Sequence, residues 1–396
     1  MRSFARSTAG RAGLVLALSL VCGFLAAAGN QWYVERDFEC FWIAGRIATG
    51  GGDPYDPAQY QAATSANRPA ADALAACGPR FPWPPWTTLV FTALATLSLP
   101  LASTLWIALL VAATVLGIGW TWQLAGPRRI PWPVVAVLVI LTEPFVLALM
   151  HGQFGALFLA LTAGAGLWLR SRNGLRAGLA MAALAVKPHT ALVSGPVLLA
   201  LAVRSRQWNA VAAAGGLFTL ALAVSVALRP SWLAGWIAAL DENRGIPVVR
   251  NTTWDLARSL GSWWLAFVII ALVLAAVVAL MRARPLEHAD VVALGAAFSM
   301  VVAPHAWAHD FMILAIPWTV TLAHANALRP SQRRALTYGT LFVAAPLFWI
   351  FQIFIQVVRT DESLSAFIPI LTTLLLALSI RMATGSATIR KTPEVT

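Results

Sequence analysis

The stretch LASTLWIALLVAATVLGIGWTWQL, residues 101–124, decides the fold class of this chain. It contains no charged side chain, and it is longer than the roughly 20 apolar residues that cross a bilayer as one helix. Similar apolar runs occur along most of the chain, separated by short stretches rich in Arg, Pro and Gly. Because a chain in lipid must satisfy its backbone polar groups internally, the sequence predicts an all-α protein that crosses the membrane many times.

The overall composition leads to the same conclusion. The chain has 396 residues, of which 59% are hydrophobic and 11% are charged, whereas soluble domains carry about 25% charged residues. The formal net charge of +12 does not indicate a nucleic-acid partner, because the basic residues form small clusters between apolar segments, as topology signals do. A soluble domain and a nucleic-acid-binding protein are both excluded.

The basic clusters predict the topology. They lie at Arg128–Arg129, Arg170–Arg176, Arg204–Arg206, Arg282–Arg284, Arg329–Arg334 and Arg381–Lys391. Positively charged loops favour the cytosol, so we assign all of these to that side and expect about 10 to 13 membrane segments. The run Ala12–Ala28 follows three arginines and resembles a cleavable secretory signal, but it is long enough to span, and we interpret it as the first anchor.

This topology places two demands on the chain. The segment Trp86–Leu124, broken at Pro100, has to make an odd number of net crossings, and Leu175–Val203 has to dip out and back. Short or broken segments of that kind persist where they line a cavity of the protein. The unusual polar stretches then fall on the outer side: the first loop at about residues 29–85, His151-Gly-Gln153, Lys187-Pro-His189, the loop Arg229–Ser262, and Pro304–Asp310.

The first outer loop contains a predicted helix that begins at Asp37. Phe38, Phe41, Trp42 and Gly45 are spaced i, i+3, i+4 and i+7, so we expect one face that is apolar or small and that lies on the membrane interface. Asp37 at the start of such a helix is explained by an N-cap that accepts backbone N–H bonds. A functional carboxylate is the other interpretation, and one side chain can serve both purposes.

Lys187 is one of two lysines in the chain, and it lies between two apolar segments beside Pro188 and His189. A charge at such a place is costly and usually faces a cavity, so we favour an anion site over a lysine that extends its side chain to the interface. Phosphate is the anion expected near lipid headgroups.

His305, His309 and Asp310 end another apolar segment. Two His residues at i, i+4 followed by Asp are compatible with a metal site, but no further ligand motif accompanies them, and we predict hydrogen bonds to a phosphate or a sugar hydroxyl and no metal. Four tryptophans near segment ends are interpreted first as interfacial belt residues: Trp83, Trp86, Trp263 and Trp264. Cys40 and Cys77 share the outer loop, and whether they pair is left open.

Taken together, these stretches resemble glycosyltransferase family 87. The motifs are Asp37-Phe38, Ala44-Gly45-Arg46, Gly52-Asp-Pro-Tyr55, Phe81-Pro-Trp-Pro-Pro85, Gly152-Gln153, Lys187-Pro188 and Pro304-His-Ala-Trp307. Each is weak alone, but their order is in register with the apolar segments. Trp83 departs from the pattern, since members often have Tyr before the two prolines.

The resemblance implies a GT-C type transmembrane helical bundle with a catalytic acidic residue in an early extracytoplasmic loop, the position of Asp37. It also implies that the sugar donor is a polyprenyl-phosphate sugar, typically polyprenyl-phosphate mannose. The sugar would be transferred with inversion to a lipid-linked or glycan acceptor. Such a reaction needs a carboxylate base and fixed donors for the departing phosphate. We assign Asp37 as base and Lys187, His189 and His305 to the donor phosphate. The expected sugar or acceptor contacts are Glu39, Arg46, Tyr55, Gln153, Trp307 and His309.

The predicted organisation is one membrane domain over residues 1–382 and a short polar cytosolic tail over 383–396. We expect a multi-pass protein of the cell membrane whose site faces away from the cytosol. Its expected partners are the donor, the acceptor and membrane lipids, without a cofactor. Two other classes remain open: a transporter or flippase of lipid-linked sugars, and a noncatalytic assembly factor. The sugar, the acceptor and the linkage are not predicted by the sequence.

Overall fold

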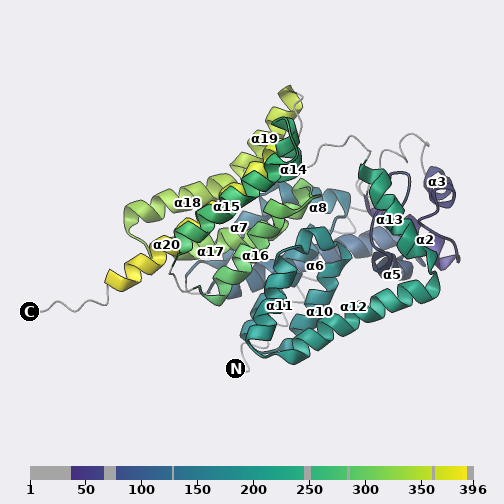
Figure 1. Cartoon of the computed structure of the whole chain (residues 1–396), viewed down its shortest axis with the longest axis horizontal. Coiled ribbons are helices and arrows are strands. Elements are labelled where there is room, and N and C mark those ends of the chain that lie inside the picture. Colours follow the sequence, from purple (N-terminus) through teal and green to yellow (C-terminus); the bar gives the residue numbers. More distant parts are fainter. Residues whose placement is uncertain are drawn as a thin grey trace, which may run out of the picture.

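The computed structural model of the chain is built from helices (Figure 1). It describes residues 37–66, 77–126, 129–244, 251–282, 286–358 and 362–389, and no strand occurs within these ranges. The predicted all-α fold class is therefore confirmed. The expected first span, Ala12–Ala28, lies outside the described residues.

The helices are labelled as in Figure 1, with 3-10 helices written η. Their bounds are α2 Asp37–Thr49, α3 Pro57–Ser65, α5 Pro85–Leu94, α6 Leu99–Ala125, α7 Trp132–Ile140, α8 Glu143–His151, α9 Gly155–Arg170, α10 Gly174–Ala183, η2 Leu184–Val186, η3 Pro188–Ala191, α11 Ser194–Arg204, α12 Trp208–Leu228, α13 Ser231–Arg244, α14 Thr253–Ser259, α15 Leu265–Met281, α16 His288–Val302, η4 Ala308–Leu314, α17 Ala315–Ala325, α18 Pro330–Ala344, α19 Pro346–Val358, η5 Glu362–Ala366 and α20 Phe367–Ile389.

Several helices have the length and composition of membrane spans. α6, α12 and the run Ser363–Ala383 each qualify alone, and α7 with α8 qualifies as one broken span that bends by 60°. Shorter apolar helices, among them α9, α15 and α16, lie between these spans along the chain. The chain is therefore a polytopic membrane protein.

Prolines divide two of the predicted segments. The stretch Trp86–Leu124 forms α5 and α6, with Pro100 in the first turn of α6, where its missing N–H costs nothing. The apolar run Leu336–Val357 is long enough for one span, but it divides into α18 and α19 at Pro346. Within the stretch 383–396, which was predicted as the tail, α20 continues to Ile389.

The described parts of the basic loops around Arg129 and Arg170 lie at one end of the bundle, together with Glu287 and Asn326. Arg170 donates to the carbonyl oxygens of Gln123 and Leu124 at 2.7 and 2.8 Å. Arg129 pairs with Glu287 at 3.1 Å, and the side chain of Asn326 donates to the carbonyl of Arg129. The grouping of these loops agrees with their common assignment to the cytosol.

The predicted hairpin in the middle of the chain is present. α10 leaves the basic end and α11 returns to it, where Gln207 donates to the carbonyl of Leu169 at 2.8 Å. Lys187 lies at the turn, between η2 and η3. Trp86 and Thr87 of α5 donate to the carbonyls of Ala185 and Val186 at 2.7 and 2.8 Å, so they satisfy backbone acceptors that the broken helix leaves open. Trp86 is thus a structural partner of the hairpin in addition to any interfacial role.

The sequence predicted that the apolar face of α2 lies on the membrane interface, and this prediction is wrong because the face is buried in the protein. Phe38 and Phe41 are fully buried, and their rings pack against Phe91 and Trp106. Gly45 permits this packing, because a Cβ there would come within 2.6 Å of the carbonyl oxygen of Phe91. The helical period identified the buried face correctly, but it does not distinguish lipid from an aromatic core supplied by α5 and α6.

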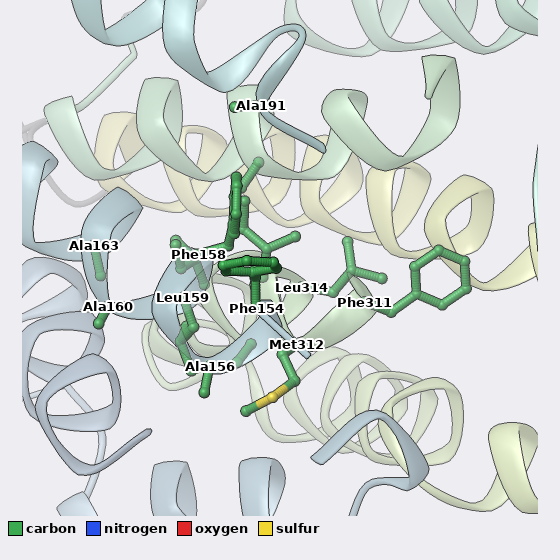
Figure 2. Close-up of a cluster of buried hydrophobic side chains, with 14 of the residues drawn as sticks. Phe154, Ala156, Phe158, Leu159, Ala160, Ala163, Ala191, Phe311, Met312 and Leu314 are labelled. Carbon is green, nitrogen blue, oxygen red and sulfur yellow. The ribbon is translucent and has the colours of Figure 1, made fainter. Parts of the chain in front are cut away.

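A second part of the core joins α9 to η4. Figure 2 shows Phe154, which precedes α9, and Phe158 of α9 close to Met312 and Leu314 of η4. Gly155 begins α9, and a Cβ at this position would overlap the carbonyl oxygen of His309. The close approach at Gly155 places η4 directly beside the turn that precedes α9.

Candidate active site

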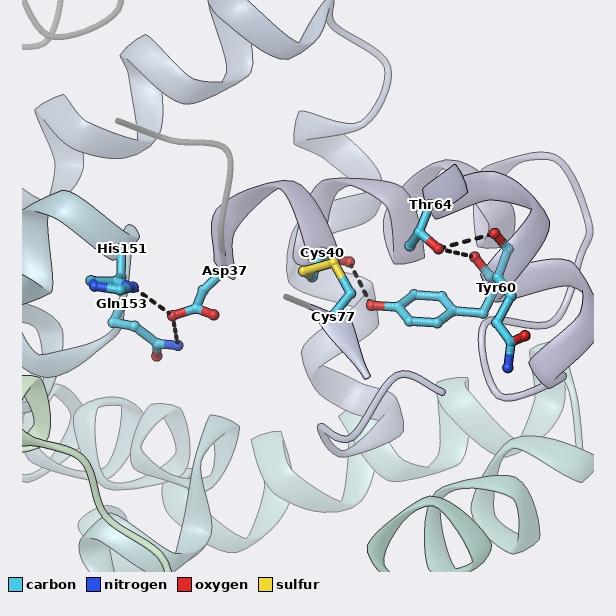
Figure 3. The surroundings of a disulfide bond; sticks show 8 residues. Asp37, Cys40, Tyr60, Thr64, Cys77, His151 and Gln153 are labelled. Carbon is cyan, nitrogen blue, oxygen red and sulfur yellow. Dashed lines mark hydrogen bonds and ion pairs between the residues drawn. A yellow bond between two sulfur atoms is a disulfide. The ribbon is translucent and has the colours of Figure 1, made fainter. Parts of the chain in front are cut away.

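Asp37 is held at the start of α2 by two side chains from the turn between α8 and α9. Its Oδ2 accepts a hydrogen bond from Gln153 Nε2 at 3.0 Å and lies 3.4 Å from His151 Nδ1 (Figure 3). The Asp37 side chain is 21% exposed and that of His151 is 24% exposed. The carboxylate is thus fixed in direction while a small molecule can still reach it.

The conformation of Gly152 makes this arrangement possible. Gly152 ends α8 with φ +63°, and its carbonyl accepts a hydrogen bond from Trp106 Nε1 at 2.7 Å. A Cβ on Gly152 would lie 2.7 Å from Cβ of Phe38, the residue next to Asp37. A left-handed glycine without a side chain therefore lets the turn meet α2.

Lys187 forms a buried ion pair with Asp310 across 2.6 Å. The two side chains are 2% and 1% exposed, and Asp310 also accepts from the backbone N–H of Trp307 at 3.1 Å. Lys187 Nζ lies 3.4 Å from His309 Nε2. An ammonium only donates, so His309 Nε2 accepts, and the neutral ring carries its proton on Nδ1.

The remaining predicted phosphate ligands are half-buried and lie beside each other. The ring centroids of His189 and His305 are 5.2 Å apart, and Trp307 Nε1 donates to His305 Nε2 at 3.2 Å. Since that nitrogen is an acceptor, a neutral His305 donates through Nδ1. The rings of His151 and His309 are 6.3 Å apart and link this group to Asp37.

Two pKa values are shifted at the site. Burial raises the pKa of Asp37, but the hydrogen bonds from His151 and Gln153 and the neighbouring imidazole charge lower it by more, so the net pKa is below the ordinary 3.8. Burial and the charge of Lys187 place the pKa of His309 well below 6.5. At neutral pH Asp37 is ionised and His309 is neutral.

The structure brings most of the predicted site residues together. Asp37, Gln153, Lys187, His189, His305, Trp307 and His309 form the connected group described above. Arg46 lies elsewhere, since it donates to the carbonyl of Ala95 and stacks on Trp42. Tyr55 is buried and donates to the carbonyl of Trp83 at 2.7 Å, and Glu39 is 3% exposed. The geometry therefore supports no direct ligand contact for Tyr55 or Glu39.

Two members of the group were not assigned from the sequence. His151 was placed only in an outer polar stretch, and Asp310 was grouped with His305 and His309, but neither was assigned as a site residue. A buried lysine needs a counter-charge. Asp310 ends the same polar stretch as His305. The need of Lys187 for a nearby negative charge was therefore the signal in the sequence that could have identified Asp310 as its partner. In the described part of the chain, no three His, Cys, Asp or Glu side chains are arranged to hold a metal ion.

Cys40 and Cys77 form a disulfide, which answers the question that the sequence left open. Their Cα atoms are 5.4 Å apart and 37 positions apart in the chain. Figure 3 shows the disulfide beside Tyr60, whose hydroxyl donates to the carbonyl oxygen of Cys40 at 3.5 Å. The disulfide therefore links α2, at a position one helical turn after Asp37, to Cys77 in the segment that leads to α5.

We expect Cys77→Ser to destabilise this segment. Closing a loop of this length in the unfolded chain is worth about 4 kcal/mol in the chain-entropy description. Thermal inactivation in detergent should therefore occur at a lower temperature than for the wild type, and a reducing agent should have the same effect. Cys22→Ser, at the third cysteine, is the control; an equal loss in both variants would contradict the role of the bridge.

Gly155→Ala is expected to disturb the site through η4. The new Cβ would displace the His309 carbonyl, at a cost of about 1 to 3 kcal/mol, and would move His309 and Asp310 with it. The matched control is Gly119→Ala in α6, where no atom lies within 4 Å of the added Cβ and the change should be neutral or slightly stabilising. Melting temperature and transfer rate measure both; equal effects would refute the argument.

The sequence model of glycosyltransferase family 87 matches residues 81–304, more than half of the chain. The chain belongs to glycosyltransferase family 87. The match includes Gln153, Lys187 and His189, and it ends immediately before His305. Asp37 lies before the matched region, so its place in the site depends on the contacts with His151 and Gln153.

No curated protein and no solved structure matches the chain. Membership in family 87 makes the protein a glycosyltransferase, and the helical architecture is consistent with the GT-C superfamily.

Proposed function

We propose that this glycosyltransferase moves a hexose, namely mannose, from a polyprenyl-phosphate donor to a lipid-linked or glycan acceptor. The transfer inverts the anomeric centre and takes place at the extracytoplasmic face of the cell membrane. The observation that carries the proposal is the position of an ionised, partly exposed Asp37 in one connected group with Lys187, His189 and His305.

Asp37 is suited to act as the base. An acceptor hydroxyl attacks the anomeric carbon efficiently only if its proton is removed, and a positioned carboxylate within hydrogen-bond reach does this. Among the described residues, His151 and Gln153 both contact Oδ2, and we assign Oδ1 to the acceptor hydroxyl. A single displacement inverts the anomeric carbon and requires no enzyme nucleophile.

The leaving group is the second requirement. Negative charge grows on the phosphate as the glycosidic bond breaks, and fixed donors stabilise it. His189 and His305 are half-buried, whereas Lys187 is paired with Asp310 in the buried layer next to them. We therefore assign direct contact with the phosphate to the two histidines. Lys187 contributes its charge from the layer beneath.

The assignment to the outer face rests on the arrangement of the loops. α9 runs from the site at Gly155 to Arg170 at the basic end, a length of about 24 Å at the rise of an α-helix. The site and the basic loops thus lie at opposite ends of the bundle. If the basic loops are cytosolic, the site faces outward.

The test is transfer of labelled sugar by purified protein in detergent, with polyprenyl-phosphate mannose compared against polyprenyl-phosphate glucose and a nucleotide sugar. We expect labelled product from a polyprenyl-phosphate donor and none from the nucleotide sugar. Transfer from the nucleotide sugar alone would refute the donor class. Passage of the lipid across liposomes without transfer would support the flippase alternative instead.

The dependence of kcat/KM on pH should reveal the state of Asp37. Since its pKa is below 3.8, the base stays deprotonated as the pH falls through the range where an ordinary Asp would gain a proton. The acid limb should therefore lie below that of a free carboxyl group. Gln153→Leu removes one stabilising hydrogen bond and should move the limb to higher pH; an unchanged limb would contradict this account.

A further inference from the structure

The helix α13, Ser231–Arg244, falls in a stretch that the sequence suggested was a loop, and it has three distinct sides. One side faces the protein and includes Trp232 and Ala239, which are 3% and 0% exposed. The neighbouring side is apolar but uncovered. Its residues, spaced i, i+4 and i+7, are Leu233, Ile237 and Leu240, with exposures of 36%, 59% and 39%. The third side consists of Ala234, Ala238 and Asp241, which are small or acidic and are exposed or half-buried.

The protein-facing side of α13 packs against the segment between α2 and α5. Trp236 Nε1 donates to the carbonyl of Pro82 at 3.2 Å, and the ring of Trp232 packs on Tyr55. Gly235 allows this contact, because a Cβ there would lie 2.5 Å from Cβ of Tyr55. α13 is therefore packed on the first loop and cannot swing freely.

Polar contacts at both ends of α13 reinforce the attachment. Arg80 pairs with Glu242 at 2.7 Å near the C-terminal end. At the other end Ser231 Oγ lies 2.9 Å from Asp53 Oδ2, and Arg229 donates to the carbonyl of Gly51 at 2.8 Å. α13 thus holds the turn that follows α2, the helix of Asp37.

The uncovered apolar side continues a surface that faces lipid. α12 has the length and hydropathy of a membrane span, and only 6% of its span is buried in the protein. It ends at Leu228, which is 61% exposed, and α13 begins three residues later. Figure 1 shows α13 running across the end of α12 instead of extending it. A helix that turns sideways at the end of a span reaches the level of the membrane boundary.

We propose that α13 lies in the membrane interface, with Leu233, Ile237 and Leu240 in the boundary between headgroups and acyl chains, and that it anchors the segment carrying Asp37 to the bilayer surface. An apolar side beside a charged side is the arrangement by which helices lie in that boundary. The exposed Trp263 and Trp264 at the start of α15, 57% and 53% exposed, fit the aromatic belt at the same end of the bundle.

The test measures depth directly. Single nitroxide labels are placed at Leu233, Ile237 and Leu240 in a Cys22→Ser background, and the full-length protein is reconstituted in phosphatidylglycerol and phosphatidylethanolamine nanodiscs. Accessibility to oxygen, which enters lipid, is compared with accessibility to a water-soluble nickel complex. The lipid control is a label at Leu220 of α12, and the water control is a label at Ala62 on the polar helix α3; both positions are exposed.

We expect all three α13 labels to favour oxygen as Leu220 does, by at least several-fold over Ala62. Preference for the nickel complex would place α13 in water and overturn the proposal. Protection from both reagents would mean that a protein surface covers the apolar side, which also overturns it. The measurement does not involve sugar transfer, so it stands or fails independently of the proposed function.

Discussion

Asp37→Asn is expected to lower kcat for sugar transfer by about three orders of magnitude, because a positioned general base typically contributes 10²–10⁴-fold. Asn keeps the size of the side chain and can still meet His151 and Gln153, so the loss should appear in kcat with a small change in KM for the donor. Initial rates with a labelled polyprenyl-phosphate sugar measure both constants.

The control is Asp56→Asn in the same outer segment. Asp56 caps α3 by accepting from the backbone N–H groups of Ala58 and Gln59, and Asn is an equally good N-cap. This variant should transfer sugar at close to the wild-type rate. If Asp37→Asn retained more than a tenth of the activity, or if both variants lost it equally, Asp37 would not be the base.

The spacing of residues predicted the helix α2, but not the surroundings of Asp37. The contact with Gln153 joins positions 116 apart in the chain. It depends on the left-handed turn at Gly152 and on the aromatic packing of Phe38, and neither is visible in a local pattern. Apolar periodicity indicates which face of a helix avoids water, but it does not indicate whether lipid or protein covers that face.

The hairpin around Lys187 could be predicted because hydropathy and basic loops leave few topologies that close. The partner of Lys187 was harder to predict, since the lysine and Asp310 come from segments 123 positions apart. α13 was missed for a different reason. Its residues Asp241, Glu242 and Asn243 are equally consistent with a solvated loop and with a loop that contacts the acceptor. The i, i+4 spacing of Trp232 and Trp236 among apolar and small neighbours was the available signal for a helix.

Variants of the Lys187–Asp310 pair can distinguish its contribution to stability from the contribution of the Lys187 charge to the reaction. Removing one partner leaves the other charged and buried, which typically costs 3 to 5 kcal/mol. Asp310→Asn should therefore lower the melting temperature strongly and abolish transfer, since it also weakens the acceptor for the Trp307 N–H. Arg129→Gln, which breaks an exposed pair with Glu287, should cost less than about 1 kcal/mol.

The double variant Lys187→Met with Asp310→Leu is the informative one. It removes both charges at once, and apolar replacement of a buried pair is often close to neutral for stability. If Lys187 contributes its charge to the departing phosphate, the double variant should regain most of the melting temperature, short of the Trp307 N–H hydrogen bond that a leucine does not accept. It should nevertheless transfer sugar at least 100-fold more slowly than the wild type. Recovery of both properties would show that the pair only holds η4 against the hairpin, and the two histidines alone would then carry the phosphate.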